Sequence, residues 1–144
     1  MKVSQLLATK GRDVVTVAPN DTVETVAKIL SEKGFGALVV STDGESISGI
    51  VSERDVVRRL GVDGAGLLSK QVSSIMTSTV RVCGEDDSVE RLMEMMTEHR
   101  IRHLPVTADG KLTGIVSISD VVRVRVRQLE LEADQLERYI SNTW

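Results

Sequence analysis

The chain has 144 residues, of which 41% are hydrophobic and 27% charged, a size and balance typical of one folded domain rather than a disordered chain. A net charge of −3 and only 2% aromatic residues argue against nucleic acid as a partner. No apolar run approaches the roughly 20 residues that span a bilayer, and the first residues are too polar for a signal peptide. The single cysteine, Cys83, allows no internal disulfide, which suits a reducing compartment. From these features together we expect a cytoplasmic protein with no membrane partner.

The first half of the chain predicts a β-α-β-β-α unit. A β-branched segment is followed by a helix with apolar residues at a 3.6-residue period, which begins after the N-cap residue Thr22. An Asp43-Gly44 pair between two apolar segments is typical of a β-hairpin. The predicted strands are 14–17, 37–40 and 47–51, and the second helix begins at Ser52.

The second half repeats the first with a period of about 65 residues, longer than the periods typical of solenoid repeats. Residues 14–24 align with 80–90, and residues 49–58 with 114–123. The predicted strands are 80–82, 103–106 and 112–116, with helices beginning after Ser88 and at Ser117. We therefore predict an α+β fold with two β-α-β-β-α units, at residues 1–70 and 71–125, followed by a helical extension at 126–144.

Each unit closes with the motif Gly-Ile-Val-Ser-x-x-Asp, which ends in Asp55 in the first unit and in Asp120 in the second. A serine and an aspartate three residues apart at a helix start form a capping box, which needs no ligand. The same carboxylate can also accept two hydrogen bonds from the vicinal hydroxyls of a ribose, beside helix N–H groups that favour an anion. The glycine allows a close backbone approach. The occurrence of the motif at matching positions of both units favours the binding interpretation.

The repeated unit resembles the cystathionine β-synthase (CBS) domain, and the chain is similar to a stand-alone, bacterial-type CBS pair, or Bateman module. The resemblance rests on both closing motifs and on Leu104-Pro105-Val106, and covers residues 2 to about 125. It implies two units related by a pseudo-twofold axis, with two composite clefts that bind adenosine-containing ligands. Asp55 would then share a cleft with residues of the second unit, and Asp120 with residues of the first.

The resemblance also implies roles for individual residues. The two aspartates would hold ribose, supported by Ser52 and Ser117, while strand residues would contact the base. The residues implied for the base are Thr16, Val17, Ile50, Val51, Val80, Val82, Ile115 and Val116.

The two clefts are predicted to be unequal. Arg54, Arg102 and His103 occupy positions where basic residues contact phosphate in nucleotide-sensing relatives, and the planar arginine fork binds phosphate bidentately. Gly36-Ala37, the counterpart of Arg102-His103, is predicted to leave the Asp120 cleft roomier and neutral. The alternatives are a solvated strand-edge charge for Arg102 and a core-edge histidine for His103.

The sequence contains no grouping that predicts catalysis, so we expect no enzyme activity and no catalytic cofactor. His99 and His103 are four residues apart, but His103 is on a predicted strand, so the two are not expected to bind zinc or another metal together. Cys83 is interpreted as a small buried hydrophobic residue.

The C-terminal segment has a heptad pattern. Apolar residues recur at spacings of four and three, at Val122, Val126, Leu129, Ala133, Leu136 and Ile140. A helix from about residue 120 to 140 would carry this stripe, which either folds back onto the domain or pairs with a second chain. We expect a homodimer.

The function that these patterns predict is a non-catalytic adenine-nucleotide sensor that signals to an unidentified protein. AMP is the expected ligand, with ATP, ADP, NAD(H) and S-adenosylmethionine as alternatives. The alternative function is a ligand-free interaction protein that acts through the C-terminal helix.

Overall fold

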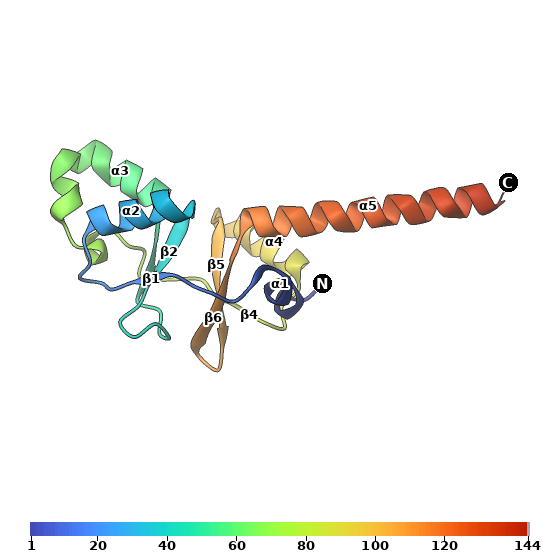
Figure 1. Ribbon diagram of the computed structural model, residues 1–144, viewed down its shortest axis with the longest axis horizontal. Coiled ribbons are helices and arrows are strands. Elements are labelled where there is room, and N and C mark those ends of the chain that lie inside the picture. The colour runs from blue at the N-terminus through green and yellow to red at the C-terminus, as the bar shows by residue number, and fades with distance from the viewer. Residues whose placement is uncertain (144) are drawn as a thin grey trace.

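The computed structural model describes residues 1–143 as two similar units lying side by side, with a long helix that runs out from the second (Figure 1). The first unit contains β1 (Thr16–Val17), α2 (Val23–Lys33), β2 (Ala37–Val40), β3 (Gly49–Ser52) and α3 (Glu53–Asp63). The second contains β4 (Cys83–Gly84), α4 (Val89–His99), β5 (His103–Ala108), β6 (Lys111–Ser117) and α5 (Ile118–Thr143). Helix α1 (Val3–Lys10) precedes the first unit, and the 3₁₀ turns η1 (Gly64–Ser69) and η2 (Val72–Ser74) join the two. The predicted α+β fold is confirmed.

Each unit has a three-stranded sheet of the same topology. The strand orders are β1-β2-β3 and β4-β5-β6, and in each sheet the first pair is parallel and the second antiparallel. The side chains of β3 alternate, so that Val51 is buried while Ile50 is partly exposed on the other face. This alternation directs one side of the closing motif to the core and the other side to the space between the units.

The first strand of each unit is shorter than predicted. β1 begins at Thr16 rather than residue 14, and the predicted strand at 80–82 is wrong because β4 begins at Cys83. The residues before each strand leave the sheet and line the space between the units, where Val15 and Val80 are found. Cys83 itself is buried, as predicted.

The two hydrophobic cores cross the predicted division at residue 70. The N-terminal helix α1 contributes Leu6 and Leu7 to the core of the second unit, beside Leu104 and Val116. Leu67 and Val72, which follow α3, pack in the core of the first unit. The lead-in segments, residues 3–7 before the first repeat and 72–76 before the second, are therefore exchanged: the first packs in the core of the second unit and the second in the core of the first.

The glycine that opens each closing motif is required by this packing. A Cβ atom at Gly114 would lie 2.8 Å from a methyl carbon of Leu7, and one at Gly49 would lie 2.5 Å from the sulfur of Met76. The sequence predicts a close approach at these glycines, and the groups that approach them are the side chains of Leu7 and Met76.

Helix α5 is longer at both ends than the predicted 120–140. Val121 is fully buried in the second core, and Val124 packs against it, whereas the residues beyond extend away from the body (Figure 1). In the part of the chain that the structure describes, no helix combines the length and apolarity needed to cross a membrane.

Candidate functional site

The first cleft lies between the two units and has a volume of about 380 Å³. Its walls come from the closing motif of the first unit and from the segments that precede β4 and β5 in the second. It brings together nine residues predicted for the site: Gly36, Ala37, Ile50, Ser52, Arg54, Asp55, Val80, Arg102 and His103. The composite arrangement expected for Asp55 is thus found.

Asp55 both caps helix α3 and lines the first cleft. Its Oδ2 accepts from the Ser52 backbone N–H at 2.8 Å and from Ser52 Oγ at 3.0 Å, while the Asp55 N–H donates to Ser52 Oγ at 3.2 Å. Within residues 1–143, no group donates a hydrogen bond to the other oxygen, Oδ1. The capping box therefore fixes the carboxylate through one oxygen and leaves the second available to a ligand.

The first cleft is strongly basic although the protein is acidic. Five arginines line it, together with His99 and His103, against only two acidic residues, Glu53 and Asp55. None of the five forms an ion pair with any acid in residues 1–143. The five are Arg54, Arg58, Arg81, Arg100 and Arg102. Such unpaired guanidinium groups around a concave surface suit a phosphate or other polyanion.

Sequence reasoning missed three of these arginines. Arg58 lies one helical turn after Arg54 on α3, so the i, i+4 spacing was a usable signal. Arg81 adjoins the predicted Val80. Arg100 is the C-cap of α4 with φ 54°, a left-handed conformation that the sequence did not indicate.

A wall shared by both clefts is formed where β2 and β5 begin. Gly36, Ala37, Arg102 and His103 line both hollows, together with Glu53. A Cβ atom at Gly36 would lie 3.0 Å from the His103 ring, so the glycine makes room for the imidazole. Burial lowers the pKa of His103 below its ordinary value, against the opposing effect of Glu53 and Asp120. His103 is therefore neutral near pH 7 when no anion is bound.

The second cleft has a volume of about 640 Å³ and contains Asp120 together with residues of the first unit. Ile115, Ser117 and Asp120 line it, as predicted. It is the roomier cleft, as expected, but the expected cause is wrong because Gly36 and Ala37 lie on the wall that both clefts share. Its charges balance, with Lys10, Arg102 and Arg123 against Asp13, Glu53 and Asp120.

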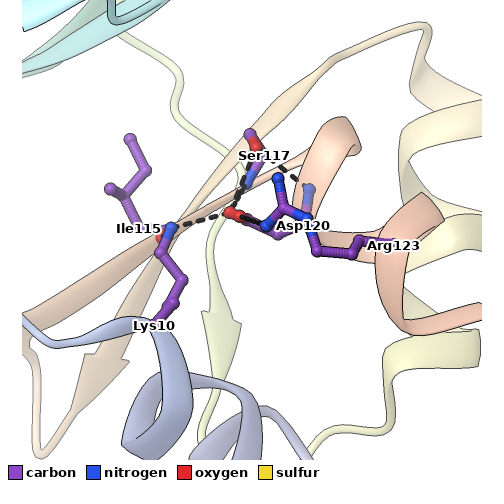
Figure 2. Close-up of polar contacts among 5 residues, drawn as sticks. All are labelled: Lys10, Ile115, Ser117, Asp120 and Arg123. Atoms are coloured by element: carbon purple, nitrogen blue, oxygen red, sulfur yellow. Dashed lines mark hydrogen bonds and ion pairs between the residues drawn. The ribbon is translucent and has the colours of Figure 1, made fainter. Parts of the chain in front are cut away.

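The carboxylate of Asp120 is already occupied by groups of the protein (Figure 2). Its Oδ2 repeats the capping contacts with Ser117, at 2.9 Å from the backbone nitrogen and 3.0 Å from Oγ. The Nζ of Lys10 also donates to this oxygen at 2.6 Å and to the Ile115 carbonyl at 2.7 Å. Arg123 Nη1 lies 3.6 Å from Oδ1.

Lys10 therefore changes the chemistry of the second closing motif. Burial opposes the ionisation of Asp120, but the hydrogen bonds from Lys10 and Ser117 outweigh it and hold the pKa of the carboxyl below its ordinary value. Lys10 bonds to the same oxygen, Oδ2, that accepts the capping bonds, and Arg123 faces Oδ1, so a ribose at this carboxylate would compete with two cationic groups that Asp55 does not have within residues 1–143. Sequence reasoning missed Lys10, because it lies on α1, far from the motif in the chain.

Some predicted base contacts are not placed in either cleft. The side chains of Val17, Val51 and Val116 are buried in the two cores, because alternate residues of a strand face opposite sides of the sheet. Thr16 and Val82 are outside the linings of both clefts. The prediction that Val17, Val51 and Val116 flank a base is corrected accordingly.

Comparison with known proteins agrees with the duplicated architecture. The CBS domain family matches the chain twice, at residues 3–62 and 72–127. The chain belongs to the CBS domain family. The two matched segments cover both closing motifs, so this protein is a CBS pair.

Relatives of the pair include a plant protein and a bacterial protein of known structure. The mitochondrial CBS domain-containing protein CBSX3 of Arabidopsis thaliana is 36% identical over 147 residues, covering 96% of this chain and 71% of its own. The crystal structure of the CBS-domain containing protein ATU1752 from Agrobacterium tumefaciens is 42% identical with a TM-score of 0.84, covering 87% of this chain and 99% of that one.

A further solved structure is the CBS domain pair of protein MJ0100 in complex with 5′-methylthioadenosine and S-adenosyl-L-methionine. It is 25% identical with a TM-score of 0.77, and the match covers 86% of this chain and 98% of that one. Together, the family and the two composite clefts support a ligand-binding regulatory module.

Proposed function

We propose that this CBS pair is a non-catalytic regulatory module that binds an adenine nucleotide in the first cleft, with AMP as the expected ligand. The observation that carries the proposal is the open Oδ1 of Asp55 beside five arginines that have no ion pair within residues 1–143. Asp55 would accept hydrogen bonds from the ribose hydroxyls, and the arginines would bind the phosphate.

The surfaces of the first cleft suit the other parts of the ligand. Ile50 and Val80 offer apolar surface for the adenine, and Ser52 lies beside the ribose position. ADP, ATP and NAD(H) carry more phosphate and remain alternatives, since the five arginines exceed what one phosphate needs. S-adenosylmethionine, present in the MJ0100 complex, carries no phosphate and would leave the arginines unmatched.

We propose that the ligand signal passes to a partner through the second unit. The first cleft is lined by both units, so a bound nucleotide would hold them together and stabilise one relative arrangement. Helix α5 begins in the second unit and carries an exposed apolar stripe, through which we propose that the module forms a homodimer. A reducing compartment such as the cytoplasm suits the buried, unpaired Cys83.

Thermal denaturation with AMP, ADP, ATP, NAD(H), S-adenosylmethionine and adenosine tests the ligand proposal. A ligand at 100 times its dissociation constant stabilises the folded state by about 2.7 kcal/mol. We expect AMP to raise the melting temperature and adenosine, which lacks phosphate, to raise it far less. The proposal is wrong if no adenine nucleotide raises the melting temperature.

The alternative, a ligand-free interaction protein, is favoured by the exposed stripe of α5. An Asp55→Ala, Asp120→Ala variant distinguishes the two functions. If this variant still captures a protein partner through α5 as well as the wild-type protein does, and the wild-type protein binds none of the nucleotides, the alternative holds.

A further inference from the structure

The outer part of α5 has apolar side chains that no other part of residues 1–143 covers. Val126 is 48% exposed, Leu136 62% and Ile140 56%. The helix leaves the body after its first turns and runs out alone (Figure 1). A single exposed helix gains little stability from its own sequence, so the apolar stripe needs a covering surface.

The stripe has the same spacing when it is followed in either direction. Its members lie four, three, four, three and four residues apart, which is symmetric about residue 131. Two copies of α5 laid antiparallel would therefore match apolar residues along the whole seam. The layers would be Val122 with Ile140, Val126 with Leu136, and Leu129 with Ala133, each repeated by the twofold axis.

The charges of α5 are separated along its length. Residues 121–128 contain three arginines and no acidic residue, whereas residues 129–140 contain four acidic residues and one arginine. Antiparallel pairing would bring the basic half of each helix against the acidic half of the other, whereas parallel pairing would align like with like. Antiparallel pairing would also place the two helix dipoles in opposite directions, which is favourable.

We propose that a second copy of this chain covers the stripe and that the two α5 helices pair antiparallel, in register about residue 131. The inference rests on the proposed homodimer and adds its direction and register. In this register Arg123 of one chain lies beside Glu137 of the second copy, on the same flank of the seam.

The arrangement connects the dimer to the second cleft. Arg123 lines that cleft and lies 3.6 Å from Asp120. Glu137 of the second copy would compete with Asp120 for the same guanidinium group. Each chain would thus contribute a charge near the second cleft of the other.

Cysteine cross-linking tests the direction of pairing. Chains carrying Val122→Cys and chains carrying Ile140→Cys are prepared separately, then mixed and oxidised. Positions 122 and 140 lie about 27 Å apart along one helix, so antiparallel pairing predicts a disulfide only in the mixture. The wild-type chain is the control, because Cys83 is buried and burial raises the pKa of its thiol to about 12.

Every outcome of the cross-linking decides the inference. Cross-links within each single variant indicate parallel pairing and overturn the inference while keeping the homodimer. No cross-link together with a monomer by sedimentation overturns both the direction and the homodimer, whereas nucleotide binding is tested separately by the thermal measurements. A dimer without any cross-link assigns the interface to another surface and also overturns the inference.

Charge exchange provides a second measurement. Arg123→Glu alone is expected to weaken the dimer about tenfold, since two exposed ion pairs become repulsive contacts. Adding Glu137→Arg should restore the affinity in the antiparallel pair only. Arg127→Glu, on the outer side of the helix, is the matched control and should change the affinity far less.

Discussion

In the first cleft, Asp55 keeps one carboxylate oxygen without a donor, whereas in the second cleft Lys10 and Arg123 lie against the oxygens of Asp120. Both aspartates follow the same motif and make the same capping contacts with a serine. The difference comes from outside the motif. Aligning the two lead-in segments, Val3 with Val72, places Thr79 at the position of Lys10, and Thr79 lines the first cleft.

A repeated motif thus fixes the position of a carboxylate but not its availability to a ligand. The availability is set by the lead-in segment, which reaches each cleft from a distant part of the chain. A neutral threonine leaves the first carboxylate unpaired, whereas a lysine neutralises the second. We therefore expect one strong nucleotide site, at Asp55.

Removing Asp55 should mainly weaken AMP binding, whereas removing Asp120 should mainly lower the stability of the fold. Asp55→Ala should reduce AMP affinity by about 10- to 100-fold, since a hydrogen bond to a charged group contributes about 1.5–3 kcal/mol. Asp120→Ala should leave AMP affinity nearly unchanged but cost more stability, because it leaves the Lys10 ammonium unpaired beside the Ile115 carbonyl. Calorimetry measures the affinity and urea denaturation the free energy of unfolding. Equal affinity losses in both variants would contradict the unequal clefts.

The two strand glycines, Gly49 in the first unit and Gly114 in the second, should differ in how much an alanine substitution destabilises the protein. Gly49→Ala should cost about 2–3 kcal/mol, because its Cβ would also lie 2.9 Å from the carbonyl oxygen of Thr77. That carbonyl accepts from the Ile50 N–H, and the Thr77 N–H donates to the Ile50 carbonyl, so the backbone there is held on both sides. At Gly114 the three atoms nearest to an added Cβ all belong to the side chain of Leu7, so Gly114→Ala should cost about 1–2 kcal/mol.

Urea denaturation measures both glycine variants. Gly61→Ala, where the added Cβ has no neighbour within 4 Å, is the control and should not destabilise the protein. If Gly114→Ala costs more than Gly49→Ala, the buried leucine is less adaptable than the backbone contact at Thr77.

The sequence was sufficient to predict the repeated architecture because helix caps and apolar periods are local. Thr22 and Ser88 accept hydrogen bonds from the N–H groups of Thr25 and Arg91, as their N-cap positions predict. The family resemblance added the composite clefts, which no local pattern contains. The residues alone did not fix which face of each strand points to the core. A shift of one residue moves a side chain from the cleft to the core, and Val51 lies in the core.

The state of the second cleft could not be predicted, because it depends on a contact between residues 110 positions apart. From the sequence alone, Lys10 would be predicted to be an exposed charge near the end of a helix. Only the packing of α1 against the second unit brings its ammonium group to Asp120. The same packing explains why the cores do not respect the predicted boundary at residue 70.

Removing the lysine should open the second cleft. Lys10→Met keeps the length and apolar stem of the side chain but frees the Asp120 carboxylate, so we expect the affinity of the second cleft for AMP to rise about tenfold. Calorimetry should then resolve two bound AMP molecules per chain in place of one. Lys28→Met, at an exposed pair with Glu24, is the control and should keep a single site. A single site in Lys10→Met would mean that the lysine does not exclude the ligand.

The smallest expected effect concerns His103, on the wall between the clefts. Burial lowers the pKa of its imidazole, so the ring is neutral near pH 7 in the unliganded protein. A bound phosphate favours the protonated ring, so AMP binding takes up a proton and its affinity should rise about threefold from pH 8 to pH 6.5. Calorimetry across this range measures the change, with adenosine as the ligand control that should show none. His103→Gln should remove the dependence; if it persists, the proton is taken up by the phosphate itself, whose second pKa is about 6, or by another group in the first cleft, and His103 does not set the pH dependence.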